Sequence, residues 1–129
     1  MISRVWIPLV TPVEDGGTDL AGDRKLVDYY IKAGAAGRFP LCTTGEAPTL
    51  DDIEVDEIIV TTIEAVDGRM PVLFGAGGNA TVKVIRQIHR MDHYDVQGFV
   101  SVCLITTGRP RTECANTLQP SRMPQIIKY

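Results

Sequence analysis

Short apolar runs alternate along the chain with longer segments in which apolar residues recur every three or four positions. Continuous apolar runs are typical of buried strands, and a period of 3.6 residues is typical of amphipathic helices. The expected strands cover residues 5–10, 39–42, 71–74, 98–104 and 124–129. The expected helices cover residues 23–35, 51–66 and 81–91. Each lies between two successive strands among the first four.

Several of the predicted helix ends carry residues with capping chemistry. Asp51 and Glu54 have the spacing of a capping box, in which each side chain accepts a hydrogen bond from the backbone N–H of the other residue. Asp67 and Gly68 follow this helix and are expected to end it. We expect Gly37 to end the preceding helix, residues 23–35.

The alternation of strands with helices of 10–15 residues predicts βαβ units and a parallel sheet. The crossovers should be right-handed. Residues 106–122 are the exception, because they contain Gly108, Pro110 and Pro120 and few apolar positions, so they predict no amphipathic helix. The chain has no low-complexity segment or linker, and residues 1–129 are expected to form a single domain.

Composition and charge disfavour several classes of protein. The 129 residues are 44% apolar and 22% charged, as in globular domains. A net charge of −3 with scattered basic residues disfavours a nucleic-acid binder, and no apolar run reaches the roughly 18 residues of a membrane span. The N-terminus lacks the layout of a secretory signal. The three cysteines, Cys42, Cys103 and Cys114, are not closely spaced, so they predict no disulfide framework and no zinc site. This cysteine usage indicates a cytoplasmic protein.

The polar loop of residues 43–46 has the position of a ligand-binding loop. It follows a predicted strand and precedes the capped helix, and parallel α/β folds bind ligands at the carboxyl ends of their strands. The adjacent hydroxyl groups of Thr43 and Thr44, together with free backbone N–H groups, could hold a small carboxylate. The alternative is a βα loop that is simply rich in turn-forming residues.

A second loop, residues 75–80, satisfies the pattern G-x-G-x-x-A between a strand and a helix. Asp95 lies at roughly the distance at which an acidic residue could bind a ribose, so a dinucleotide site is an alternative function. Because two strand–helix units precede this loop, a tight turn at a helix N-terminus remains the other interpretation.

His89 and His93 are four residues apart and could share a helix face as metal ligands. No third ligand is evident, and the glutamate of an H-E-x-x-H site is missing. A solvated helix end explains the pair, and we expect no metal site.

Five segments, in this order and spacing, resemble the dihydrodipicolinate synthase and N-acetylneuraminate lyase family. Cys42 stands where the family's G-T-T-G-E motif begins with glycine. The resemblance covers about residues 5–103, and the segments that carry it are residues 8–12, 26–37, 42–46, 67–72 and 75–81.

This resemblance implies a parallel (β/α)₈ barrel of the TIM type, of which the chain would hold the first four strand–helix units and a fifth strand. It implies a lyase that condenses pyruvate with an aldehyde through a Schiff base on a lysine of the sixth strand. The leading reaction is the synthesis of 4-hydroxy-tetrahydrodipicolinate in lysine biosynthesis. The resemblance implies no cofactor, and it implies a homo-oligomer, since members of the family are commonly tetramers.

The family's functional residues have counterparts at three positions. By resemblance, Thr43 would be the threonine of a proton relay, and Thr44 would contact the carboxylate of pyruvate. A hydroxyl group can both donate and accept a hydrogen bond, which suits a relay. Tyr129 would be a relay tyrosine on the fifth strand, although it could also be a tyrosine without a role. The family's other tyrosine-bearing stretch corresponds to residues 104–108, which contain no tyrosine.

The Schiff-base lysine has no counterpart within residues 1–129. Lys128 lies on the fifth strand rather than the sixth, and the other lysines lie on predicted helices: Lys25, Lys32 and Lys83. The alternative hypothesis is therefore a non-catalytic half-barrel, a fragment or a degenerate homologue that only binds or assembles. A (β/α)₈ barrel typically has about 250 residues, so we expect residues 1–129 alone to associate or to fold poorly.

Overall fold

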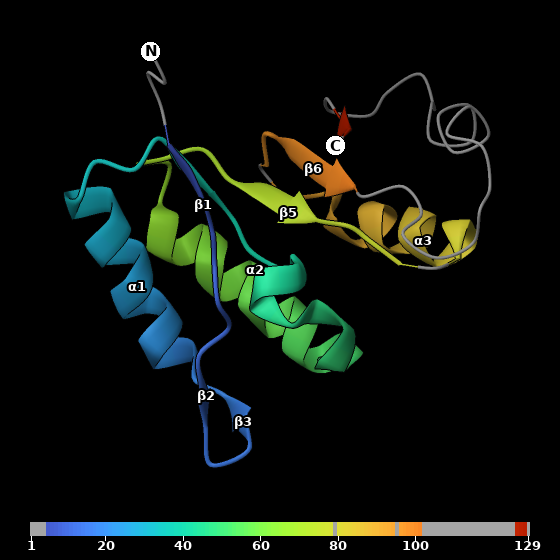
Figure 1. Ribbon diagram of the computed structural model, residues 1–129, viewed down its shortest axis with the longest axis horizontal. Helices are drawn as coiled ribbons and strands as arrows, with labels where there is room; N and C mark the ends of the chain where they lie inside the picture. The colour runs from blue at the N-terminus through green and yellow to red at the C-terminus, as the bar shows by residue number, and fades with distance from the viewer. Residues whose placement is uncertain (1–4, 79, 95, 102–125, 129) are drawn as a thin grey trace.

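Helices and strands alternate along the chain in the computed structural model, which describes residues 5–78, 80–94, 96–101 and 126–128 (Figure 1). The α-helices of the described part are α1 (Leu20–Lys32), α2 (Asp52–Val66) and α3 (Thr81–Met91). Two 3₁₀ helices lie between β4 and α2, namely η1 (Thr43–Gly45) and η2 (Ala47–Thr49). The strands are β1 (Trp6–Pro8), β2 (Val13–Glu14), β3 (Gly17–Thr18), β4 (Gly37–Phe39), β5 (Leu73–Gly75), β6 (Gly98–Ser101) and β7 (Ile126–Lys128).

The main strands run parallel and lie in the order in which they occur along the chain. β1 pairs with β4, and β6 pairs with both β5 and β7, in every case parallel. A single parallel bridge between Arg38 and Val72 joins β4 to β5. The backbone N–H of Gly75 reinforces this contact by donating to the carbonyl oxygen of Pro40 over 2.9 Å. The order is therefore β1-β4-β5-β6-β7, which confirms the predicted parallel α/β architecture.

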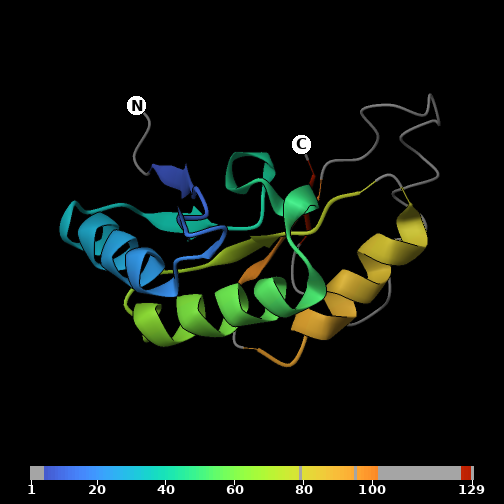
Figure 2. The same ribbon diagram turned by 90° about the horizontal axis from the view of Figure 1, so that it is seen from below.

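The three α-helices lie along one face of these strands (Figure 2). Four side chains, each no more than 1% exposed, fill the layer between helices and strands: Ile59, Phe74, Ile88 and Phe99. Both phenylalanines come from strands and both isoleucines from helices, as the apolar pattern predicts. No α-helix of the described part covers the other face, and none of its helices is long and apolar enough to cross a membrane.

The capping box of α2 is confirmed. Asp51 Oδ1 accepts hydrogen bonds from the backbone N–H groups of Ile53 and Glu54, at 2.8 and 2.9 Å. Glu54 Oε2 accepts in return from the backbone N–H of Asp51 at 3.0 Å. Asp67 caps the other end in a left-handed conformation with φ of 46°, as its position after the apolar stripe indicates. The bounds of α3 are also those predicted.

The end of the first helix was predicted wrongly. α1 stops at Lys32, and the residue that turns the chain is Gly34, whose φ of 78° favours glycine. Gly37 lies in β4 instead, beneath the ring of Trp6, where a Cβ atom would clash. The helix also begins earlier than predicted, because Asp19 caps it by accepting from the N–H of Gly22.

Most strands are shorter or shifted relative to the prediction. β1 covers only Trp6–Pro8, β4 begins two residues before the predicted segment, and β5 begins two residues later and ends one residue later than predicted. An apolar run marks a buried strand but does not show where backbone pairing starts, which depends on the neighbouring strand. Residues 102–125 lie outside the described part, and so do the end of the predicted fourth strand and the weak crossover.

Candidate functional site

Loops that follow β1, β4 and β5 meet at one edge of the sheet, because the carboxyl ends of parallel strands point the same way. The loop after β4 contains the two threonines that the sequence singles out. The glycine-rich segment after β5 lies on one side of the loop after β4, and the segment after β1 lies on the other side of that loop.

Thr43 and Thr44 lie on η1, a tight turn closed by backbone hydrogen bonds. The N–H of Gly45 donates to the carbonyl of Cys42 at 3.0 Å, and the N–H of Glu46 donates to that of Thr43 at 3.1 Å. Both threonine side chains are exposed. The structure thus keeps the two hydroxyl-bearing residues together at the sheet edge, as predicted, and leaves them open to a ligand.

Residues in the left-handed region flank this turn on both sides. Leu41, two residues after β4, has φ of 59°, and Glu46 has φ of 52°. Neither residue is glycine, and a left-handed conformation costs an ordinary residue roughly 1–2 kcal/mol. Such a conformation persists only where surrounding contacts enforce it. Leu41 lies close against β5, since a Cβ atom on Gly75 would overlap the carbonyl oxygen of Leu41.

A hollow of about 570 Å³ lies beside the turn. Cys42 and Thr43 line it from the loop after β4, whereas Thr44 does not border it. Much of the remaining lining is apolar or glycine, and it includes Val55 and Ile59 of α2. The two threonines therefore differ in their surroundings: both are exposed, but only Thr43 borders the hollow.

The cations near this hollow are not poised as nucleophiles. Arg90 of α3 forms ion pairs with Asp52 at 2.8 Å and Asp56 at 2.6 Å, and the hydrogen bond to Asp56 raises the pKa of the Arg90 guanidinium. Lys83 also borders the hollow but is exposed. A lysine that attacks a carbonyl must be neutral, which requires burial or a nearby cation. The other lysine side chains that the structure describes, on Lys25 and Lys32, are exposed as well.

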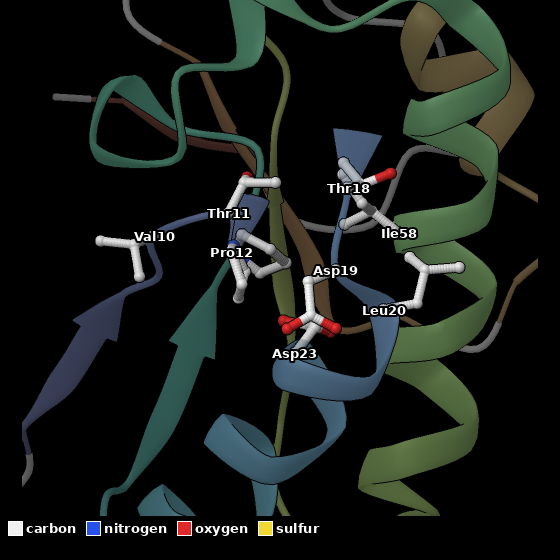
Figure 3. A pocket seen from close by; sticks show the side chains of 9 residues that line it. Val10, Thr11, Pro12, Thr18, Asp19, Leu20, Asp23 and Ile58 are labelled. Atoms are coloured by element: carbon white, nitrogen blue, oxygen red, sulfur yellow. The ribbon is translucent and has the colours of Figure 1, made fainter. Parts of the chain in front are cut away.

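A second, much smaller pocket lies where the segment after β1 meets the start of α1 (Figure 3). Its volume is about 10 Å³, so it is no larger than a single water molecule. Thr11, Pro12, Asp19 and Asp23 are among the residues that line it. Val10 also lines this pocket (Figure 3). This pocket is too small to hold pyruvate, so the hollow beside η1 is the better candidate for a substrate site.

The sequence interpretation missed a buried polar cluster behind the strands. Arg38 of β4 is fully buried and donates to Asp23 of α1 at 3.3 Å and to Thr62 of α2 at 3.2 Å. Burial lowers the pKa of the Arg38 guanidinium, and the charge of Asp23 opposes that effect. A signal was present: Arg38 interrupts an otherwise apolar strand, and Asp23 lies four residues before the buried Val27 on α1.

Several of the remaining predicted site residues lie outside the described part of the chain, and the described histidines form no metal site with other side chains. Tyr129 lies outside the described residues, and so do Asn79 of the glycine loop and Asp95. The strands of the described part follow one another without the reversal of order at which doubly wound folds bind dinucleotides, so the fold does not favour that alternative. His89 and His93 are both exposed, and no group of three metal-ligating side chains occurs among the described residues.

The sequence matches the model of the dihydrodipicolinate synthetase family over residues 1–104. It is 46% identical over 102 residues to 4-hydroxy-tetrahydrodipicolinate synthase 2 of Clostridium acetobutylicum. The matched region covers 79% of this chain and 36% of the relative. It is 36% identical over 102 residues to 4-hydroxy-tetrahydrodipicolinate synthase of Thermotoga neapolitana, with 79% of this chain and 35% of the relative covered. The chain thus spans about a third of the length of these relatives.

Solved structures of dihydrodipicolinate synthases share this arrangement of helices and strands. The enzyme from Bacillus anthracis superposes with a TM-score of 0.88 at 27% identity, covering 98% of this chain and 44% of that structure. The 4-hydroxy-tetrahydrodipicolinate synthase of Methylacidiphilum fumariolicum gives a TM-score of 0.84 at 26% identity, covering 100% of this chain and 44% of that structure.

Proposed function

Because the chain belongs to the dihydrodipicolinate synthetase family, we propose that it is the N-terminal portion of a lyase that condenses pyruvate with an aldehyde. The proposed reaction is of the 4-hydroxy-tetrahydrodipicolinate synthase type, in lysine biosynthesis. The observation that carries the proposal is the Thr43–Thr44 turn, which lies at the carboxyl edge of a sequentially ordered parallel sheet and borders a hollow at Thr43.

The proposed fold of the whole protein is a (β/α)₈ barrel of the TIM type. Support comes from the strand order, in which each main strand lies beside the next one along the chain, and from α-helices on one face only of the described sheet. A barrel of this type needs eight strands and about 250 residues, and residues 1–129 would supply the first four units and a fifth strand as one domain. We refer to this longer polypeptide as the complete barrel protein.

Each proposed site residue has a role that fits its chemistry. Thr43 would relay a proton, which suits a hydroxyl group because it donates and accepts without holding charge. Thr44 would hold the carboxylate of pyruvate, and its exposed hydroxyl is open to such a contact. Tyr129 would be a further member of the relay. No cofactor enters this scheme.

The nucleophile would be a lysine of the sixth strand of the complete barrel protein. Its neutral amine would attack the ketone carbon of pyruvate, and the resulting carbinolamine would lose the former ketone oxygen and the two amine hydrogens as water, which leaves an imine. The lysine side chains described within residues 5–101 are exposed, which supports a nucleophile elsewhere in the barrel and keeps the non-catalytic half-barrel as the second candidate.

We further propose that the complete barrel protein is cytoplasmic and assembles as a homo-oligomer, with pyruvate and an aldehyde as its substrates. The family membership supports this assignment.

The test is reduction of the imine in the complete barrel protein. Borohydride delivers hydride to the imine carbon and converts it into a stable secondary amine, so incubation with pyruvate and borohydride should add a covalent adduct to one lysine, detected by mass spectrometry. Thr43→Val should lower turnover by roughly 10²-fold, the scale of one lost proton-transfer group. Thr49→Val, on the same loop, is the matched control and should leave turnover unchanged. An unmodified lysine after this treatment would refute the Schiff-base mechanism and favour the half-barrel alternative.

A further inference from the structure

One hydrogen bond joins the segment after β1 to the threonine turn after β4. The hydroxyl group of Thr11 donates to the carbonyl oxygen of Gly45 over 2.7 Å, across 34 positions of the chain. Gly45 is the last residue of η1 and is buried, whereas Thr43 and Thr44 in the same turn are exposed. The bond therefore holds the buried end of a turn whose other two residues face outward.

The backbone of Gly45 also packs closely against the first loop. A Cβ atom at this position would lie 2.9 Å from the carbonyl oxygen of Leu9 and 3.2 Å from the hydroxyl oxygen of Thr11. Only a glycine allows this approach without displacing backbone. The contact and the hydrogen bond thus form one interlock between the two loops, made by Leu9, Thr11 and Gly45.

Thr11 can hold the turn because its own segment is fixed on both sides. Before it, the N–H of Leu9 donates to the carbonyl of Phe39 in β4 at 3.4 Å. After it, the carbonyl of Pro12 accepts from the N–H of Asp19 at 2.8 Å, and Asp19 in turn caps α1. Figure 3 shows Thr11 and Pro12 beside Asp19 at the start of that helix. The hydroxyl group is therefore presented from a rigid part of the fold.

The turn needs such an outside contact. Leu41 and Glu46 hold left-handed conformations on its two sides, which an isolated loop would relax. The bonds that close η1 join residues only three apart, so they do not fix the position of the turn relative to the sheet. The hydrogen bond from Thr11 is long-range, so it fixes the position of the turn relative to the sheet.

Building on the proposed function, we propose that Thr11 is a positioning residue for pyruvate condensation. It acts through Gly45: its hydroxyl group holds the buried end of η1 so that the hydroxyl groups of Thr43 and Thr44 stay aimed at the substrate. Thr11 itself contacts no reacting atom. The loss of its hydroxyl group should therefore misplace the two threonines without unfolding the protein.

The experiment compares Thr11→Val, which keeps the shape and loses the hydroxyl group, with Thr11→Ser, which keeps the hydroxyl group. Both variants are made in the complete barrel protein. Thr11→Val should speed exchange of the Gly45 and Glu46 amide hydrogens about 3- to 10-fold and lower kcat/KM for pyruvate by a similar factor, the scale of one hydrogen bond. Thr11→Ser should restore both values. Thr49→Val is the matched control, since its hydroxyl donates to the exposed Glu46 carbonyl at 2.8 Å and spans three residues only.

The outcomes separate this inference from the proposed function. Equal exchange and equal kinetics in Thr11→Val and the wild type would overturn the positioning role, and so would faster exchange with unchanged kinetics. A wild-type protein without turnover would refute the proposed function, and the exchange comparison alone would then decide whether Thr11 holds the turn. If Thr11→Val does not fold, Thr11→Ala takes its place against Thr11→Ser.

Discussion

Three arginine–carboxylate pairs in the described part of the chain involve α1, and two of them differ in burial much more than in geometry. Arg38 and Asp23 are 3.3 Å apart with side chains 0% and 6% exposed. Arg24 and Glu64 are closer, at 2.6 Å, but their side chains are 47% and 58% exposed. Solvent and salt screen the shorter pair, so we expect it to contribute no more than about 1 kcal/mol. The buried pair carries a desolvation cost, which makes each charge strongly dependent on the other.

We predict that Asp23→Asn in the complete barrel protein lowers the free energy of unfolding by about 3–5 kcal/mol, because it leaves the buried Arg38 charge uncompensated. Adding Arg38→Met to this variant should recover much of the loss, since the charge itself is removed. Urea unfolding of the two single variants and the double variant measures the coupling between the two residues. The matched control is the cycle of Arg24→Met and Glu64→Gln. A buried-pair coupling no larger than that of the exposed pair would contradict the prediction.

Within the described part of the chain, the contact between β4 and β5 depends on a glycine. These strands share one bridge, and they approach so closely where β4 ends that a side chain at Gly75 would overlap the Leu41 carbonyl. Gly77, two residues later, has open space where its Cβ would lie. The glycines of this loop therefore have different roles: Gly75 allows strand contact, whereas nothing near Gly77 requires glycine.

We predict that Gly75→Ala destabilises the complete barrel protein by about 1–3 kcal/mol, because the added methyl group must displace backbone at the end of β4. Gly77→Ala should change stability by less than about 0.5 kcal/mol. Thermal unfolding of the two variants checks this difference, and kinetics with pyruvate would show whether the Thr43–Thr44 turn moves with Leu41. Equal unfolding midpoints for the two variants would show that β4 and β5 do not meet as described.

At the scale of the whole molecule, residues 1–129 expose surfaces that the complete barrel would cover. Among the described strands, β1 pairs only with β4 and β7 only with β6, so each leaves one edge unpaired. The described sheet also has one face without an α-helix (Figure 2). Unpaired edges and uncovered faces favour association with further chains.

We therefore predict that a polypeptide of residues 1–129 associates or folds poorly, in contrast to the complete barrel protein. Size-exclusion chromatography with light scattering reports its mass, and thermal unfolding followed by circular dichroism reports its cooperativity. A monomer with a cooperative unfolding transition would show instead that the half-barrel is stable by itself.

The sequence alone determined the features that depend on neighbours along the chain. The order of the α-helices and the main strands, the capping box at Asp51, the bounds of α3 and the order of motifs that identifies the family all arise from local periodicity, local hydrogen bonding or spacing. The Thr43–Thr44 loop could be predicted as a candidate site for the same reason. Tyr129 remains a prediction.

Only the tertiary structure decided the features that depend on residues far apart in the chain. Gly37 could not be assigned to a strand without the Trp6 ring above it, and the burial of Arg38 depends on Asp23 and Thr62 from two helices. The bond from Thr11 to Gly45 likewise joins residues 34 positions apart. The physical reason is the same in each case: periodicity and capping act over one or two turns of chain, whereas pairing, close approach and burial are set by which segments pack together.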